Sequence, residues 1–160
     1  MIGCTFENGN KTNTLRHVTV DCIITKGDTI LLAKRAPGLL EAGKWCMPGG
    51  YLNRDESTEA GMLREVMEET GCTLRNVHLL RINDLPARPK LNERGNVRFI
   101  FFAEVDTETD QHDHETAELQ WFPLNDLPNE DDVAFDHFED ITAYKRYLAE
   151  HTPLPIIGTI

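Results

Sequence analysis

The segment between residues 50 and 71 constrains the fold more than any other part of the sequence. It predicts a helix from about Ser57 to Thr70, because Gly71 follows at the position that favours a left-handed helix cap. On a helical wheel of about 100° per residue, three glutamates share one face and four other residues fall on the far side, which is predicted to meet the core. The acidic face carries Glu65, Glu68 and Glu69, and the predicted core face carries Ala60, Leu63, Met67 and Thr70.

The clustered carboxylates of this helix need a physical reason. Like charges three and four residues apart destabilise an exposed helix by about 0.2–0.5 kcal/mol per pair, and Arg64 offsets only part of this. Oxygen ligands that converge on one face suit a hard cation such as Mg²⁺, which completes its shell with waters and substrate phosphates. An isolated Glu-Glu pair would be interpreted as a solvated acidic face. Here Glu56, Arg64 and flanking glycines stand at fixed offsets, so the helix is interpreted as half of a metal site.

The overall charge excludes one class of function. With 27 acidic and 16 basic residues, the chain has a formal net charge of −11, whereas binding to a nucleic-acid backbone needs a basic face or groove. A small acidic ligand must then be attracted by a local positive site, most simply a bound metal ion. The cysteines lie far apart, which is typical of reduced, mostly buried thiols rather than of a zinc or redox site. They are Cys4, Cys22, Cys46 and Cys72.

Length and hydropathy predict the organisation of the chain. We expect residues 1–160 to form a single domain with a core over about 16–150, an N-terminal extension over 1–15 and a C-terminal tail over 151–160. The tail is either a packed extended arm or a frayed end. The start of the chain has no signal-peptide pattern and no apolar run approaches a membrane span, so we expect a cytoplasmic protein.

The remaining elements are predicted from their apolar periodicity. Residues 16–35 indicate a β-hairpin that turns at Lys26-Gly27-Asp28, and residues 37–50 indicate a structured loop. Strands on both sides of a central helix predict an α/β fold with a mixed sheet covered on both faces. Further strands are expected over 77–82, 97–105 and 119–122, with a long loop over 83–96 and a last helix over 136–150.

The spacing along the acidic helix resembles the signature of a known family. After Gly50 come five residues and Glu56, then seven residues and Arg64-Glu65-Val66, then one residue before Glu68-Glu69 and one more before Gly71. This pattern is similar, position for position, to the Nudix box, with Cys72 standing where the family has a bulky aliphatic residue. The preceding loop, Trp45 to Gly50, is also similar to the family's. The resemblance implies a Nudix-type α/β/α sandwich with a mixed β-sheet.

The resemblance also implies which groups hold a metal. Mg²⁺ is the implied cofactor, with Mn²⁺ as an alternative, and the ligands map to Glu65 and Glu69. Glu68 is implied as a further ligand or a water-mediated contact within the catalytic set, and the Gly50 region as a backbone carbonyl ligand. Arg64 is also placed in the catalytic set, although with Glu56 it is expected to brace the loop and helix rather than to touch substrate.

The implied reaction is attack of water on one phosphorus of a diphosphate bridge, with metal ions neutralising charge and lowering the pKa of bound water. In many members of the family, the general base is a glutamate on a downstream loop that precedes a Trp-bearing strand. Here Glu115 is the first candidate and Glu118 the second, although either could equally be a surface acid before a strand. His112 and His114 are expected to be solvated loop residues.

The substrate is predicted less firmly than the reaction. Arginine forks suit phosphates, although a basic loop could also simply balance charge in an acidic protein. The long loop and the segment 134–137 are similar to parts of small Nudix proteins assigned to ADP-ribose hydrolysis. We therefore expect ADP-ribose or a related nucleotide sugar, with a nucleoside triphosphate pyrophosphatase as the alternative. The expected substrate-binding residues are Arg81, Asn83, Arg88 and Arg98.

Two other function classes fit the same fold. One is a non-catalytic module that senses ADP-ribose, although such proteins usually lose a box carboxylate or add a basic domain. The other is an isomerase, which depends on further cysteine and glutamate positions in a longer chain. The expected partner is a small nucleotide substrate, without nucleic acid or membrane. A homodimer is possible, because residues 1–15 could pair two copies of the chain, but they could equally serve no such purpose.

Overall fold

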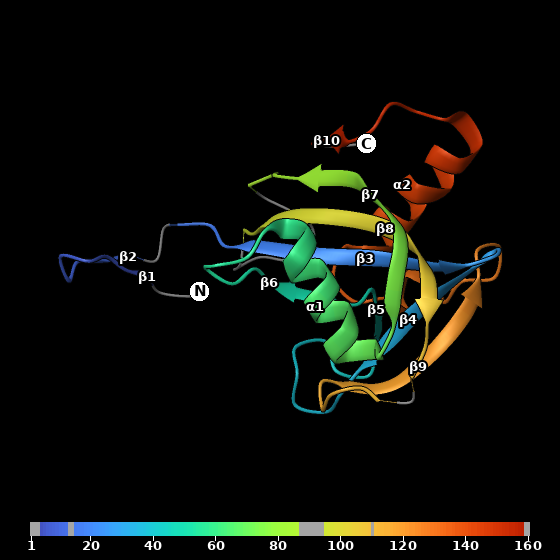
Figure 1. Ribbon diagram of the computed structural model, residues 1–160, viewed down its shortest axis with the longest axis horizontal. Helices are drawn as coiled ribbons and strands as arrows, with labels where there is room; N and C mark the ends of the chain where they lie inside the picture. The colour runs from blue at the N-terminus through green and yellow to red at the C-terminus, as the bar shows by residue number, and fades with distance from the viewer. Residues whose placement is uncertain (1–3, 13–14, 87–94, 110, 159–160) are drawn as a thin grey trace.

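A mixed β-sheet forms the centre of the computed structural model, which describes residues 4–12, 15–86, 95–109 and 111–158. Helices α1 (Thr58–Thr70) and α2 (His137–Glu150) lie on opposite sides of this sheet (Figure 1). The long strands are β3 (Val18–Lys26), β4 (Thr29–Arg35), β7 (Thr73–Asn83), β8 (Val97–Thr107) and β9 (Thr116–Pro123). The short elements are β1 (Cys4–Thr5), β2 (Lys11–Thr12), β5 (Trp45–Cys46), β6 (Gly49–Tyr51), the 3₁₀ turn η1 (Glu130–Asp132) and β10 (Ile156–Ile157).

Two strands that are far apart in sequence make the middle of the sheet. β3 and β8 run parallel, from Val18 opposite Val97 to Thr25 opposite Glu104. β3 also pairs antiparallel with β4 and with β6, and β7 pairs antiparallel with β8. The predicted hairpin over 16–35 is therefore confirmed, with Lys26 opposite Thr29 at its turn.

Alternate residues of β3 point into two separate cores, which confirms the α/β/α sandwich. Successive side chains of a strand lie on opposite faces of the sheet. On one face, Val20, Cys22 and Ile24 pack with Met62 and Val66 of α1. On the other face, a second core joins the helix α2 to the sheet, and its members include Ile23, Leu32, Ile100, Ile141 and Tyr144.

Helix α1 has the predicted ends but a different core face. Ser57 caps its N-terminus by accepting a hydrogen bond from the Ala60 N–H, and Gly71 caps its C-terminus at φ 66°. The prediction that Leu63 and Met67 meet the core is wrong, since they are 37% and 42% exposed, and Ala60 is exposed as well. Met62 and Val66 are fully buried in their place, with Thr70 buried as predicted. The helix is rolled so that Glu65 and Glu69 approach Gly49 and Gly50 of β6.

The tail is packed, because β10 adds a parallel strand to the outer edge of β7. The thiols of Cys22, Cys46 and Cys72 are free and buried, as expected. The side chain of Cys4 lies outside the described set. Among the described residues, no helix has the length and apolar character required to cross a membrane.

Candidate active site

Two glycines before α1 allow its carboxylates to approach the sheet closely. A Cβ at Gly49 would stand 2.2 Å from the Val20 carbonyl oxygen, and a Cβ at Gly50 would stand 2.5 Å from the carboxyl carbon of Glu65. The Gly49 N–H donates a hydrogen bond of 2.9 Å to Glu69 Oε2. Glycine is needed at position 49 because a side chain would collide with the β3 backbone, and at position 50 a side chain would displace the carboxylate of Glu65.

The carboxylate of Glu69 is the most perturbed acid of this region. Glu69 is 8% exposed, and its burial raises the pKa of its carboxyl to about 8. The hydrogen bond from Gly49 lowers this pKa, while the negative charges of Glu65, Asp113 and Glu115 raise it further. Burial also raises the pKa of Glu65, against the effect of Arg64. A concentration of acids that disfavours its own ionisation is typical of functional sites.

Arg64 connects the acidic face of the helix to the loop that precedes it. Its guanidinium contacts Glu56 at 2.7 Å, Glu65 at 2.9 Å and Glu68 at 3.0 Å, and donates to the Tyr51 carbonyl oxygen at 3.2 Å. Hydrogen bonds from Arg64 and from the Asn53 N–H lower the pKa of Glu56 to about 2. Because its donors are occupied by protein groups, Arg64 is placed to hold the loop and the helix together, and its role in the reaction stays a prediction.

The loop before β9 brings Glu115 to the same place. This loop is docked on the end of α1, where the Asp113 N–H donates to the Glu68 carbonyl oxygen at 2.8 Å and the Thr109 N–H donates to the Gly71 carbonyl oxygen at 3.1 Å. The Glu115 N–H then bonds to Asp113 Oδ1 at 2.9 Å. His112 and His114 on this loop are exposed, as expected.

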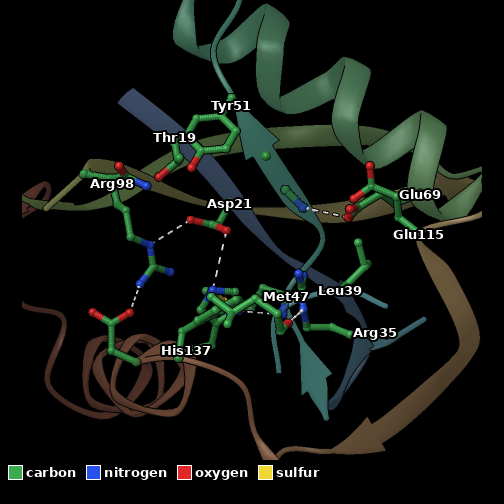
Figure 2. A pocket seen from close by; sticks show the side chains of 16 residues that line it. Thr19, Asp21, Arg35, Leu39, Met47, Tyr51, Glu69, Arg98, Glu115 and His137 are labelled. Atoms are coloured by element: carbon green, nitrogen blue, oxygen red, sulfur yellow. Dashed lines mark hydrogen bonds and ion pairs between the residues drawn. The ribbon is translucent and has the colours of Figure 1, made fainter. Parts of the chain in front are cut away.

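The second candidate base lies in a different environment. The side chain of Glu118 is 49% exposed and pairs with Lys34 at 3.1 Å, on the neighbouring strand β4. Glu115, in contrast, lies at the wall of a cavity beside Glu69 (Figure 2). The structure therefore brings Glu115 together with the box carboxylates and leaves Glu118 in a surface ion pair.

This cavity has a volume of about 240 Å³ and lies between β3, the Met47 to Tyr51 segment and the start of α2. Figure 2 shows Glu69 and Glu115 on one side of it, Asp21 at its centre, and Tyr51, Thr19 and Arg98 at the far end. The remaining lining residues are Arg35, Leu39, Leu40, Met47, Gly49, Gly50, Asn96, Phe135, Asp136 and His137. The cavity thus extends from the acidic cluster into the space between the sheet and α2.

The acidic cluster fits a divalent cation by its donor chemistry. Within the described residues, no group of three or more His, Cys, Asp or Glu side chains is arranged to hold a metal ion by itself. Glu69 is nevertheless a buried carboxylate surrounded by other acids, and its described interactions include no cationic side chain. Mg²⁺ commonly binds through one or two carboxylates plus substrate phosphates, so a partial shell is what such a site would offer. The residues that would hold it are Glu65, Glu69 and the Gly50 carbonyl.

The family follows from a direct comparison. A family model described as the NUDIX domain matches residues 15–142. The chain belongs to the Nudix family. It is therefore a Nudix hydrolase, and the helix that carries Glu65, Glu68 and Glu69 is its Nudix box.

Individual relatives agree with this assignment. An ADP-ribose pyrophosphatase of Methanocaldococcus jannaschii is 34% identical over 131 residues, which are 81% of this chain and 73% of that protein. A MutT-like protein of Streptomyces ambofaciens is 31% identical over 113 residues, covering 71% of this chain and 68% of that protein. A Nudix hydrolase of Nitrosomonas europaea whose structure is solved superposes with a TM-score of 0.74 at 25% identity, covering 88% of this chain and 94% of the other.

Two of the expected substrate-binding residues of this Nudix chain, Arg81 and Asn83, are not among the residues that line the cavity. Arg81 is 2% exposed, pairs with Asp140 at 2.8 Å and donates to the Gly158 carbonyl oxygen from Nε and Nη2. Asn83 is 1% exposed and bonds to Asp136. Both predictions are corrected, because these groups are consumed by a buried network under α2.

Arg98 reaches the cavity wall but is held by three carboxylates. Its Nε contacts Asp21 at 2.9 Å, its Nη2 contacts Asp140 at 2.8 Å, and its Nη1 contacts Asp136. Arg98 therefore orders the cavity wall by pairing with these carboxylates, and its direct contact with substrate stays a prediction. Arg88 lies outside the described residues.

Several lining residues were missed from the sequence. Arg35 donates to the Leu40 carbonyl oxygen at 2.7 Å, and its guanidinium lies over the Phe135 ring at 5.0 Å. Asp21 interrupts the apolar run of β3, which is a usable signal for a functional carboxylate, and it lies 3.7 Å from His137 Nε2. The contact between Arg35 and Phe135 had no local signal, because one hundred residues separate them.

Proposed function

We propose that this Nudix hydrolase is a Mg²⁺-dependent enzyme that cleaves the diphosphate bridge of a nucleoside diphosphate linked to another group, with ADP-ribose as its foremost substrate. The observation that carries the proposal is the convergence of Glu65, Glu69 and Glu115 beside Gly49 and Gly50 at one side of a cavity. The ADP-ribose pyrophosphatase of Methanocaldococcus jannaschii, which is 34% identical over most of the chain, supports the choice of substrate.

Different residues of the site have different roles in hydrolysis. A bound Mg²⁺ would neutralise the charge that develops on the phosphates and lower the pKa of a water molecule. Glu115 accepts a proton from the attacking water, since it is an acid at the cavity wall beside Glu69. Glu65 and Glu69 hold their carboxylates toward the Gly49-Gly50 backbone, and Arg64 fixes the orientation of Glu65. Glu68 is held by Arg64 at the outer rim of the site.

The shape of the site fits an extended substrate. Pockets that enclose a whole drug-sized ligand usually measure about 300–1,000 Å³, so a cavity of about 240 Å³ would enclose one part of a dinucleotide-sized molecule and leave the rest outside. Arg35 lines the same cavity as Glu69 and Glu115 and is the cationic side chain best placed to donate to a phosphate there. A nucleoside in the cavity with its diphosphate over the acidic cluster satisfies both observations.

The proposal is tested by paired glutamine variants in the presence of Mg²⁺. Loss of a general base typically lowers the rate by about 10²–10⁴-fold, so Glu115→Gln should lose that much of kcat. Glu118→Gln is the matched control and should keep the rate of the wild type, because its carboxylate only pairs with Lys34. Glu69→Gln should remain folded and lose most activity. Near-normal turnover of Glu69→Gln would overturn the metal assignment, and equal losses at positions 115 and 118 would overturn the choice of base.

Analysis of the reaction products distinguishes the proposed function from the other functions that a Nudix protein can have. AMP and ribose 5-phosphate from ADP-ribose would support it. A nucleoside monophosphate and pyrophosphate, released from nucleoside triphosphates at a higher kcat/KM, would instead show a nucleotide-sanitising enzyme. Binding of ADP-ribose without turnover of any member of a panel of nucleotide sugars, dinucleoside polyphosphates and triphosphates would show a sensing module.

A further inference from the structure

One buried hydrogen-bond acceptor in the cavity wall has no partner among the described residues. Asn96 is 6% exposed and lines the cavity, and its side-chain Oδ1 accepts no hydrogen bond within the described parts of the chain. Buried polar side-chain atoms nearly always have a partner, so an exception calls for an explanation. An acceptor at a cavity wall is satisfied when a ligand with an N–H or O–H group enters.

The backbone around Asn96 is held in place, so this atom is not a feature of a loose loop. Arg16 donates to the Gly95 carbonyl oxygen at 2.5 Å and to the Asn96 carbonyl oxygen at 3.4 Å. Strand β8 begins at the next residue, Val97, which lies opposite Val18 in the parallel pair. The position of Asn96 is therefore fixed from both sides by the sheet and by Arg16.

An aromatic side chain lies at the same end of the cavity. Thr19 is opposite Arg98 on β8 and opposite Tyr51 on β6, so these three residues form a row across the sheet. Asn96 directly precedes β8, two residues before Arg98, and lines the same cavity. Figure 2 shows Tyr51, Thr19 and Arg98 together at this end, away from Arg35 and Glu115. Nucleobases stack favourably on aromatic rings of this kind.

The charged groups here select for a ligand that donates hydrogen bonds. The guanidinium of Arg98 is paired with the carboxylates of Asp21, Asp136 and Asp140, so its positive charge is balanced at this end of the cavity. Asn96 Oδ1 adds a neutral acceptor beside these carboxylates. A flat group with an amino substituent matches this surface better than one with a carbonyl in the same position.

We propose that Asn96 determines the base specificity of this enzyme by accepting, at Oδ1, a hydrogen bond from the exocyclic amino group of a nucleobase that stacks on Tyr51. The proposal rests on the proposed function, because the diphosphate of the same substrate would then lie toward Glu69 and Glu115. It assigns the inner end of the cavity to the base and the outer side to the bond that is cleaved.

The test compares two substrates that differ at one group, adenosine diphosphate ribose and its 6-oxo counterpart, inosine diphosphate ribose. One neutral hydrogen bond changes an equilibrium by about 10-fold, and a group left unpaired adds to this, so the wild type should prefer the amino substrate in kcat/KM by about 10–100-fold. Asn96→Leu, of similar size but without an acceptor, should abolish the preference through KM with little change in kcat. Asn96→Asp keeps an acceptor oxygen and should keep the preference.

Thermal stability and sugar analogues complete the experiment. Asn96→Leu removes an unpaired buried oxygen and should not lower the Tm, so a loss of preference would not reflect unfolding. Equal turnover of both bases by the wild type, or an unchanged preference in Asn96→Leu, would overturn the proposal. The proposal would also be overturned if kcat/KM fell when the 2′- or 3′-hydroxyl of the adenosine ribose is removed from the substrate but not when the amino group of the base is replaced.

Failure of the proposed function would look different from failure of this inference. If no nucleoside diphosphate derivative is hydrolysed, the test uses binding affinities in place of kinetics. Calorimetry then measures the affinity of AMP and of inosine monophosphate for the wild type and for Asn96→Leu. A preference for AMP that disappears in the variant would support the role of Asn96, and equal affinities would overturn it.

Discussion

Gly71 connects the end of the Nudix helix to the loop that carries Glu115, and its replacement by alanine tests that connection. A Cβ at this position would stand 2.3 Å from the Gln111 carbonyl oxygen and 2.3 Å from Thr109 Oγ1, about 1.1 Å short of the 3.4 Å at which ordinary contact begins. The loop must therefore move by about one ångström. A misplacement of that size near a reacting group can cost about 10²-fold in rate.

The left-handed backbone at Gly71 adds a loss of stability, which a control variant with the same backbone conformation can account for. Gly71 has φ 66° and Gly27 has φ 62°, but a Cβ at Gly27 would meet nothing within 4 Å. An alanine in this conformation costs about 1–2 kcal/mol at either position, and that loss lowers Tm by about 2–8 °C in a chain of this size. Gly71→Ala should thus lose about 10²-fold of kcat, whereas Gly27→Ala should lose stability alone. Calorimetry and Mg²⁺-dependent turnover of ADP-ribose measure both effects. Equal kcat in the two variants would refute the docking of the loop as the cause.

Two further predictions concern groups outside the reacting centre. Arg81→Leu should lower the free energy of unfolding by about 3–5 kcal/mol in urea titrations, since it breaks a buried ion pair, while Arg75→Leu on the same strand breaks an exposed pair with Glu104 and should cost less than about 1 kcal/mol; equal losses would contradict the network. Because the pKa of Glu56 is lowered to about 2, its stabilising effect is complete above about pH 4.5 and is lost as the pH falls toward 2. The Tm of Glu56→Gln, followed against pH in the presence of a chelator, should fall less steeply over this range than that of the wild type, and parallel curves would refute the assignment.

The sequence predicted those parts of the fold that depend on neighbouring residues. Ser57 and Gly71 mark the ends of α1 because capping is a local interaction, and the β3–β4 hairpin follows from its turn at Gly27. The short strands β5 and β6 were read as a structured loop, since Trp45–Cys46 and Gly49–Tyr51 are too short to show a period. Their pairing is imposed by the longer strands beside them.

The errors concern choices that tertiary structure makes. Leu63 and Met67 had the apolar character of a core face, yet Met62 and Val66 occupy it, because that roll brings Glu65 and Glu69 to the glycine loop. Arg81 looked like a phosphate ligand in a basic segment, but its partner Asp140 lies 59 residues away and has no local signature. The same limitation applies to the choice between Glu115 and Glu118, which depends on how the loop docks at Gly71.

The parallel pairing of β3 with β8 has a consequence for how the protein folds. The inner end of the cavity depends on it, since Thr19 and Arg98 meet across this pair although 79 residues separate them in the chain. Contacts of such long sequence separation form slowly, because the entropy of closing the loop is lost before the contacts stabilise the chain. A nascent chain that ends before Val97 can complete the box helix but not the cavity. Binding competence should therefore appear late in refolding, after the helical signal has already recovered.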